Sequence, residues 1–347
     1  MTHTFGVRGD RVVFHDYFEK FYRDVMFPYL EEHGIKTVFQ LGDLFDKKKN
    51  VNFLTLSKAR TYFFDPLRDN GMQLIVNVGN HDTYYKHSNE ISAPDLLLRD
   101  YKNIHIIDKP EEYEIDGHNL LILPWVCNDN LEEVKSLLKR TTAQIGLGHL
   151  ELSGFSMYKG VPNEHGMDPN MFSRMDMVFT GHFHHRSHNG NIYYVGTPYE
   201  LTWSDYDDPR GFHILDLETR EVTFIPNPYC IFHKVAYDDQ DKTFEDVLHF
   251  DASKYTNCFV KVVALNKTNP YAYDAFIKKI EDEGAVDVKA TDNALMLELN
   301  DDEIIDVEDT LTLLRNVVAE TATTVPTDEL ETLMVELYVE ASRMERA

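Results

Sequence analysis

The sequence predicts a layered α/β domain, with mixed β-sheets flanked by helices, followed by a small α+β unit and C-terminal helices. Short apolar runs that indicate buried strands alternate with helical segments over the first two thirds of the chain. Most of these runs end at a Gly followed by polar residues. The pattern resumes in shorter form after Pro226-Asn227-Pro228. Open α/β sheets place their ligand sites at strand ends, so we expect a functional site at that edge.

The helices expected in the first domain carry apolar residues at helical spacing. Residues 14–33 show this spacing, and Gly34 is a natural stop. Residues 55–69 form a second helical segment that Pro66 could kink, and residues 130–140 form a third. Strands are expected between them at 37–41, 74–78, 104–107, 120–123, 145–147, 177–180 and 192–195.

The end of the first domain and the units after it are also marked in the sequence. Residues 213–217 and 221–225 indicate a closing hairpin. A βαββ unit comes next, with strands at 259–264, 286–289 and 295–299 and a helix at 271–283. We expect an acidic helix near 306–320 and a last helix that either packs on its own chain or binds a partner. The predicted divisions are 1–228, 229–302 and 303–347.

Composition limits the ways in which this chain can bind other molecules. The formal net charge is −25, with −10 in residues 1–228 and −15 in residues 229–347. A protein that held DNA by phosphate neutralisation alone would be basic, so bound cations or a basic partner would have to supply that attraction. Fourteen of the 16 histidines lie before residue 229, which places the chemistry in the first domain.

Membrane insertion and disulfide bonding are not expected. No run of 18 apolar residues and no basic-then-apolar signal peptide is present, so we expect a cytoplasmic protein without a membrane span. The three cysteines are odd in number and widely spaced, which favours buried small hydrophobic residues over a disulfide framework.

Four of the strand ends carry groups that bind metal ions. The segments are Gly42-Asp43-Leu44-Phe45-Asp46, Gly79-Asn80-His81-Asp82, Gly148-His149 and Gly181-His182-Phe183-His184. Carboxylate, carboxamide and imidazole groups without thiolates suit Mn, Fe, Zn or Mg. Two such ions side by side can activate water and neutralise a phosphate, so this set indicates phosphoester hydrolysis.

The first two motifs offer distinct roles. Asp43 could bridge two cations, or it could be a turn aspartate. Asn80 can offer its amide oxygen to a metal, and His81 beside it would then point elsewhere and act as general acid or stabilise charge on the phosphate. Asp82 could orient His81. Asp46 could support a ligand by a hydrogen bond or cap a helix.

The remaining motifs supply histidines. His149 alone would more often be a structural residue than a ligand. His182 and His184 lie two residues apart, so in an extended segment both would lie on one face and could serve two neighbouring ions. His185 would point away. Gly196-Thr197-Pro198 is expected to shape the site loop.

In this order the motifs resemble those of the calcineurin-like metallophosphoesterases. Gly-Asn-His-Asp, Gly-His-Phe-His and Ile122-Leu123-Pro124-Trp125 are most similar to the SbcD-type DNA repair exonucleases, in particular the recombination endonuclease subunits of large tailed phages. Three further segments are similar to that phage group: Gly148-His149-Leu150-Glu151, Tyr158-Lys159-Gly160 and Asp208-Pro209-Arg210-Gly211-Phe212.

The resemblance implies a layered metallophosphoesterase sandwich with a capping domain after it. It implies a nuclease with two divalent ions, most often Mn²⁺ with Mg²⁺ as the alternative, that degrades double-stranded DNA from ends and cuts single strands in recombination, repair and replication. It also implies an SMC-like ABC ATPase partner of the SbcC type, gripped by C-terminal helices, and a homodimer.

The resemblance also implies a role for each matching residue. Asp43 would bridge the two metals, and His81 would be the catalytic histidine. One ion would be held by Asn80, His149 and His182. His184 would help to hold the other.

One part of the family pattern is not matched. The family opens with a strand ending in Asp-x-His, whereas this chain opens Met1-Thr2-His3-Thr4. The next segment, Phe5-Gly6-Val7-Arg8, resembles the residues that come directly after that motif in the family. We therefore expect the ion shared with His184 to bind weakly, unless His3 substitutes, and the sheet to be one strand short. This leaves three hypotheses: a nuclease whose true start lies upstream, a non-catalytic scaffold that binds DNA ends, and a small-molecule phosphodiesterase.

Overall fold

The computed structural model describes residue 5 and residues 11–47, 49–158, 161–163 and 165–291. The chain divides into two compact units, residues 1–300 and residues 301–347, and everything described belongs to the first. The predicted strand at 295–299, both predicted C-terminal helices and His3 lie outside the described residues. No helix in the described part of the chain combines the length and the apolar character needed to cross a bilayer.

The two predicted N-terminal helices are confirmed, and each contains a wider turn in its middle. α1 (Val12–Phe21) and α2 (Phe27–Glu32) are joined by a π-helical turn, and so are α3 (Phe53–Ala59) and α4 (Asp65–Asp69). A proline lies in the first turn after each π-helical segment, Pro28 in α2 and Pro66 in α4. Proline has no N–H for the preceding turn and its ring clashes there, which explains the local widening.

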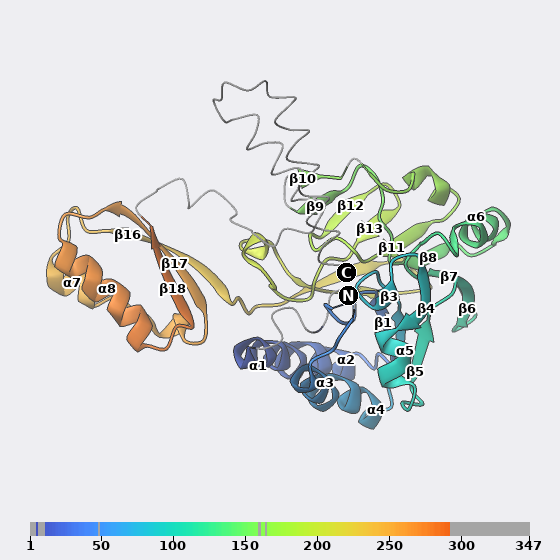
Figure 1. The fold of residues 1–347 in the computed structure, drawn as a ribbon, viewed down its shortest axis with the longest axis horizontal. Coiled ribbons are helices and arrows are strands. Elements are labelled where there is room, and N and C mark those ends of the chain that lie inside the picture. The colour runs from blue at the N-terminus through green and yellow to red at the C-terminus, as the bar shows by residue number, and fades with distance from the viewer. Residues whose placement is uncertain (1–4, 6–10, 48, 159–160, 164, 292–347) are drawn as a thin grey trace, which may run out of the picture. The chain divides into compact units, whose positions relative to one another are not determined.

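Two sheets form the centre of the first domain (Figure 1). The smaller sheet has three parallel strands in the order β1-β2-β5, and the larger has six in the order β12-β13-β11-β8-β7-β6. The strands of the smaller sheet are β1 (Thr37–Leu41), β2 (Gln73–Asn77) and β5 (Ile104–Ile107). Those of the larger are β6 (Glu111–Ile115), β7 (His118–Leu123), β8 (Ile145–Gly148), β11 (Met177–Thr180), β12 (Ser187–Asn189) and β13 (Ile192–Tyr194).

The strand register aligns the strand ends that carry the metal-binding motifs. Leu123 of β7 pairs with Gly148 of β8, and Gly148 pairs with Thr180 of β11, all in parallel strands. Parallel strands point their carboxyl ends in one direction, so the loops after β8 and β11 leave the sheet side by side. The same holds for β1 and β2, where Leu41 pairs with Asn77.

Apolar side chains from both sheets fill the space between them. The cluster includes Leu41, Ile75 and Ile107 from the smaller sheet and Ile122, Ile145, Leu147 and Phe179 from the larger. A second cluster packs the other face of the larger sheet against α6 (Leu131–Arg140). The predicted layered α/β architecture is confirmed, with helices outside and an apolar core between the sheets.

A third cluster, rich in aromatic rings, packs beneath the N-terminal helices. Phe18 stacks on Tyr199 with ring centroids 4.0 Å apart. Phe5 is buried in this cluster, and its backbone pairs with Phe45 in a parallel bridge. The Phe5 N–H donates to Leu44 O at 2.8 Å, and the carbonyl of Phe5 accepts from Asp46 N at 2.8 Å. Phe5 thus holds the segment that carries the first metal motif.

Smaller elements complete the domain. The predicted closing hairpin is confirmed as β14 (Gly211–Leu215) and β15 (Val222–Pro226). Besides β6 and β12 of the larger sheet, elements that the sequence analysis did not predict include β3 (Thr83–Tyr85), β4 (Ser88–Ser92), α5 (Ala93–Leu98), β9 (Ser156–Tyr158) and β10 (Val161–Pro162). Residues of β1 and β14 line a groove of about 640 Å³. Within the described residues β1 is an edge strand of its sheet.

Between residues 229 and 291, where the structure describes the chain, a three-stranded sheet carries two α-helices. Its elements are β16 (Phe232–Asp238), α7 (Phe244–Leu248), β17 (Phe259–Asn266), α8 (Pro270–Asp282) and β18 (Asp287–Thr291). The strands are parallel in the order β16-β17-β18. β17, α8 and β18 match three of the predicted elements, whereas β16 and α7 were missed.

Glu200 connects the first domain to the start of β16. Its carboxylate accepts the backbone N–H groups of Ile231 at 2.7 Å and Phe232 at 3.0 Å. Its own N–H donates to the hydroxyl of Tyr17 at 3.2 Å, and that hydroxyl donates to the carbonyl of Tyr229 at 3.0 Å. Burial raises the pKa of Glu200 to about 7, although the two N–H donors oppose the shift.

Stability should therefore depend on the ionisation of Glu200. Because its folded pKa of about 7 lies above the ordinary value of 4.5, its contribution is fully present below pH 4.5 and is lost as pH rises through 7. We expect the wild type to lose about 2 kcal/mol relative to Glu200→Gln between pH 5.5 and pH 8. Chemical denaturation of both proteins at several pH values tests this. Parallel stability profiles for the two proteins would contradict it.

Candidate metal centre

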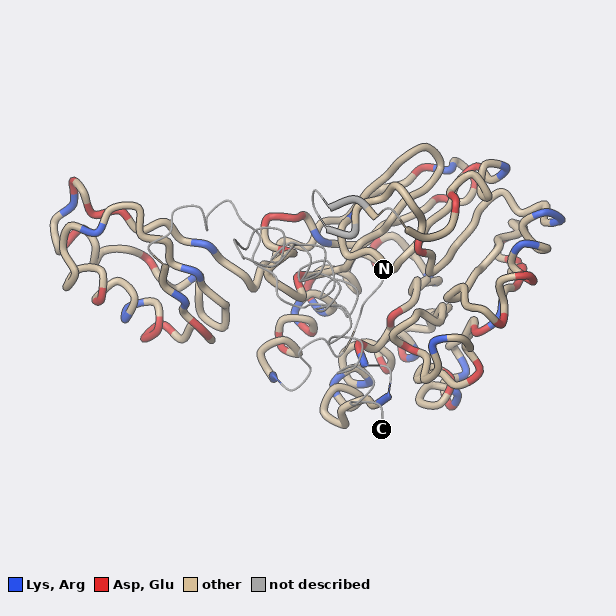
Figure 2. The backbone as a smooth tube through the Cα atoms, turned by 45° about the horizontal axis from the view of Figure 1, so that its top comes forward, with Lys and Arg blue, Asp and Glu red and all other residues tan. Residues whose placement is uncertain are grey.

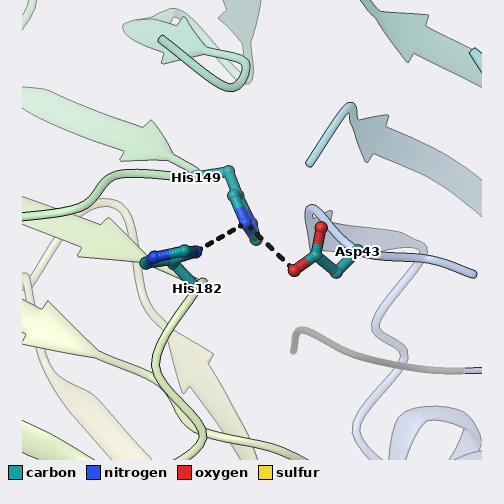
Figure 3. A group of neighbouring side chains, drawn as sticks. All are labelled: Asp43, His149 and His182. Atoms are coloured by element: carbon teal, nitrogen blue, oxygen red, sulfur yellow. Dashed lines mark hydrogen bonds and ion pairs between the residues drawn. The ribbon is translucent and has the colours of Figure 1, made fainter. Parts of the chain in front are cut away.

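Four predicted ligands converge where the two sheets meet. Asp43 follows β1 and Asn80 follows β2, while His149 follows β8 and His182 follows β11. Figure 3 shows the two imidazoles and the Asp43 carboxylate pointing toward one another. One ligand atom from each of Asp43, His149 and His182 lies within 4.8 Å of the others. The sequence motifs thus meet at one point in space.

The distances within this cluster are those of atoms in contact. His149 Nε2 lies 3.2 Å from Asp43 Oδ2 and 2.9 Å from Asn80 Oδ1. His182 Nδ1 lies 3.1 Å from Asn80 Oδ1 and 3.3 Å from His149 Nε2. Asp43 and His149 are buried, and His182 is partly buried.

The hydrogen bonds around His149 show that this cluster suits a cation. Its Nδ1 lies 2.7 Å from the carbonyl oxygen of Leu41. A carbonyl can only accept, so Nδ1 carries the proton and Nε2 presents a lone pair. That lone pair faces the oxygens of Asp43 and Asn80, which are also acceptors. A divalent cation satisfies three acceptors at this spacing, and the Leu41 carbonyl fixes the ring as supporting groups do in metal sites.

Backbone conformation brings the ligands this close. Asp43 and His182 have φ angles of 55° and 82°, in the left-handed region that non-glycine residues rarely adopt. Such strain persists where the surrounding structure imposes it, as at functional sites. A Cβ atom at Gly79 would lie 2.2 Å from Asp43 Oδ1, and one at Gly42 would lie 2.1 Å from His149 Nδ1. Both positions therefore require glycine.

Two carboxylates join the loop after β1 to the loop after β2. Asp82 accepts the N–H groups of Leu44 at 3.1 Å, Phe45 at 2.9 Å and Gly79 at 2.9 Å. In the other direction, Asp43 Oδ1 accepts the N–H of His81 at 2.8 Å. Burial, together with the nearby Asp43 charge, raises the pKa of Asp82 to about 7.

The structure corrects the expected role of Asp82. Its carboxylate binds backbone N–H groups, so it does not orient the His81 ring. The ring is held by the backbone of Asp46, whose carbonyl oxygen lies 2.6 Å from His81 Nδ1. Nδ1 therefore carries a proton, and Nε2 is the nitrogen that can exchange one. Asp46 thus contributes a main-chain carbonyl, which neither hypothesis for its side chain included.

The segment that carries His182 and His184 is not extended, as the sequence analysis had assumed. The positive φ of His182 breaks the extended geometry on which the argument rested. His184 Nδ1 instead lies 4.0 Å from Asp205 Oδ1, outside the three-residue cluster. His185 turns toward Asp208, with Nδ1 2.8 Å from Oδ2.

Arg210 holds the segment that carries these histidines. Its guanidinium donates to the carbonyl of His184 and to Thr197 Oγ1. It also pairs with Asp205 at 2.9 Å and Asp208 at 2.6 Å. Arg210 is only 5% exposed, and a buried guanidinium needs such partners to offset its desolvation. The Asp-Pro-Arg-Gly-Phe segment thus forms the support behind His184.

Trp125 is a site residue that the sequence analysis did not assign. Its ring centroid lies 5.3 Å from that of His182 and 6.0 Å from that of His149. The backbone N–H of Trp125 donates to the carbonyl of Val78 at 2.7 Å. The available signal was its position directly after β7, whose end aligns with that of β8.

Comparison with known proteins identifies the family. Residues 3–186 match the family model of the calcineurin-like phosphoesterases. The chain belongs to this family. Its members use divalent metals, and the cluster around Asp43 is a fitting site for one. The chain is therefore a hydrolase of phosphate esters, as the sequence predicted.

Curated relatives narrow the likeness. "Exonuclease subunit 1" of Enterobacteria phage T4 is 33% identical over 318 residues, which cover 91% of this chain and 90% of the relative. The SbcD subunit of the nuclease SbcCD from Staphylococcus saprophyticus is 21% identical over 86% of this chain and 77% of the relative. The protein of the same name in Staphylococcus epidermidis is 27% identical over 28% of this chain and 29% of the relative. The predicted resemblance to SbcD-type nucleases is confirmed.

Metal binding should be measurable as stabilisation. A ligand that binds only the folded state at a hundredfold excess over its Kd adds about 2.7 kcal/mol. We expect Mn²⁺ to raise the melting temperature of the wild type. Asp43→Ala should lose most of this gain, because it removes the carboxylate of the candidate ligand cluster. Thermal melts with and without Mn²⁺ provide the measurement. Asp287→Ala, which removes an exposed carboxylate from β18, is the control, and an unchanged gain in Asp43→Ala would remove Asp43 from the ligand set.

Proposed function

We propose that this chain is the metal-dependent nuclease subunit of a DNA-processing complex. The observation that carries the proposal is the convergence of acceptor atoms from Asp43, Asn80, His149 and His182 on one point. The relatives named as an exonuclease subunit and as nuclease subunits support DNA as the substrate. We infer that the reaction is hydrolysis of phosphodiester bonds, from duplex ends and in single strands.

The residues take distinct roles in this proposal. Asp43 would bind both of two divalent ions, most often Mn²⁺ with Mg²⁺ as the alternative. Asn80, His149 and His182 would hold the first ion, and His184 would help to hold the second. When bound, these ions supply an activated water and neutralise charge on the phosphate.

His81 acts as the catalytic histidine in this proposal. Its Nδ1–H donates to the carbonyl of Asp46, and its backbone N–H donates to Asp43. These two bonds fix the ring beside the ligands. Nε2, protonated in the imidazolium form, gives its proton to the leaving oxygen as the bond to phosphorus breaks.

A partner is part of the proposal. The chain carries a net charge of −25, and Figure 2 shows acidic and basic positions interspersed along the described chain. Long-range attraction to DNA therefore has to come largely from bound cations and from another protein. Relatives named as subunits support such a complex. We infer an SMC-like ABC ATPase of the SbcC type, a homodimeric nuclease core, and a division into residues 1–228, a capping domain at 229–302 and partner-binding helices at 303–347.

The activity itself is tested with two substrates. Purified wild type is incubated with Mn²⁺ and either linear duplex DNA or bis(p-nitrophenyl) phosphate, a diester without bases. We expect hydrolysis of both substrates, stopped by chelation. Hydrolysis of the small diester alone would favour a small-molecule phosphodiesterase, and hydrolysis of neither would contradict the proposed function.

Removal of the His81 ring should separate chemistry from metal binding. We expect His81→Ala to lower kcat on linear duplex DNA by about 10²- to 10⁴-fold, the range for one general acid. Mn²⁺ should still raise its melting temperature, because the proposed ligand set does not include His81 and the ring Nδ1 is held by the Asp46 carbonyl. Loss of the Mn²⁺ effect would show that His81 is a ligand. His188→Ala, which removes an exposed histidine from β12, is the matched control.

A further inference from the structure

The β3–β4 hairpin presents two exposed tyrosines. Tyr84 is 46% exposed and Tyr85 is 41% exposed. Their rings meet edge to face with centroids 4.9 Å apart, and the His87 ring lies 5.4 Å from that of Tyr85. Neighbouring aromatic rings left in solvent indicate a surface that another molecule covers.

The base of this hairpin is attached to the metal centre. β3 begins at Thr83, whose Oγ1 donates to the carbonyl of Asn80 at 3.2 Å. Asn89 of β4 donates to the carbonyl of Trp125 at 2.9 Å. Tyr84 follows Asn80 by four residues, so their Cα atoms lie within about 14 Å of each other. The hairpin that carries the tyrosines therefore starts at the candidate metal centre.

One lysine lies beside these rings in space, and another follows them directly in the chain. Lys49 Nζ lies 5.9 Å from the centroid of the Tyr84 ring. Lys47, Lys49 and Lys86 are all exposed. Aromatic faces beside exposed lysines are the combination that binds single-stranded nucleic acid, because bases stack on the rings and phosphates meet the charges.

We propose that Tyr84 and Tyr85 form a stacking surface for unpaired DNA bases and guide a single-stranded end into the metal centre. Lys49 and Lys86 contact the adjoining phosphates. The ligand is single-stranded rather than duplex DNA, because paired bases inside a duplex do not expose their faces. This inference rests on the proposed nuclease function and names the form of substrate that the site receives.

Binding without catalysis tests the proposal. The probe is a fluorescein-labelled oligodeoxythymidine of about twelve nucleotides, within the site sizes of single-strand binders, and binding to the full chain is followed by anisotropy in EDTA. We expect Tyr84→Ala/Tyr85→Ala to weaken binding roughly ten- to hundredfold, as loss of base stacking does. Tyr84→Phe/Tyr85→Phe should bind as the wild type does, because phenylalanine keeps the ring face. Tyr271→Ala, which removes an 82% exposed tyrosine from α8, is the control.

The lysine contribution has a separate signature. Lys49→Gln should reduce the slope of log K against log salt by about 0.7, the value for one phosphate contact with a single strand. Melting temperatures of all variants report whether each one is folded. If the alanine double variant is unfolded, the other two variants still test the proposal. It then requires that Tyr84→Phe/Tyr85→Phe binds as the wild type does and that Lys49→Gln lowers the salt slope.

The outcomes separate this inference from the proposed function. Equal affinity of the wild type and a folded alanine double variant would overturn the stacking surface, and so would absence of oligonucleotide binding by the wild type. Neither result would affect hydrolysis of bis(p-nitrophenyl) phosphate, which tests the nuclease centre without bases. Failure of the wild type to hydrolyse any diester would instead remove the proposed function.

Discussion

The candidate site depends on the exchange of backbone hydrogen bonds between two carboxylate-bearing loops. Asp82, from the loop after β2, accepts three N–H groups, two of them from the loop after β1. Asp43, from the loop after β1, accepts the N–H of His81. Hydrogen bonds to a charged acceptor are about twice as strong as neutral ones, and here they are buried. They hold the backbone of Asp43 in a left-handed conformation that would otherwise be unfavourable, and this conformation positions its carboxylate.

The two sheets each supply half of the cluster. Asp43 and Asn80 come from the three-stranded sheet, and His149 and His182 come from the six-stranded sheet. The spacing between these pairs is therefore set by the apolar core packed between the sheets, at near-crystalline density. A change of one methylene at Leu41 or Leu147 would alter the separation of carboxylate and imidazole. The core positions the ligands as directly as the loops do.

The strand ends were predictable from the sequence because a buried strand is an apolar run, and the loop that follows it starts with Gly and polar residues. This pattern located Asp43, Asn80, His149 and His182 before any contact was known. The roles of Asp82 and Asp46 were not predictable, because they depend on which backbone groups face them across two loops. The extended geometry expected at His182 and His184 is absent because His182 adopts a left-handed conformation, to which the side-chain alternation of a strand does not apply. β16 and α7 were missed because polar and apolar residues mix in both.

An acidic protein that hydrolyses a polyanion needs local groups at its site that attract the substrate, because its net charge repels that substrate. The net charge of −25 opposes approach of DNA at long range, but its effect is screened beyond about 10 Å at moderate salt. Within that distance, in the proposed function, cations held at Asp43 and the exposed Lys49 beside the Tyr84 ring would attract the strand. Stacking on aromatic rings adds affinity that salt does not screen. The proposed stacking surface would therefore favour duplex ends that expose unpaired bases, because its rings act only on a strand that already lies at the metal centre.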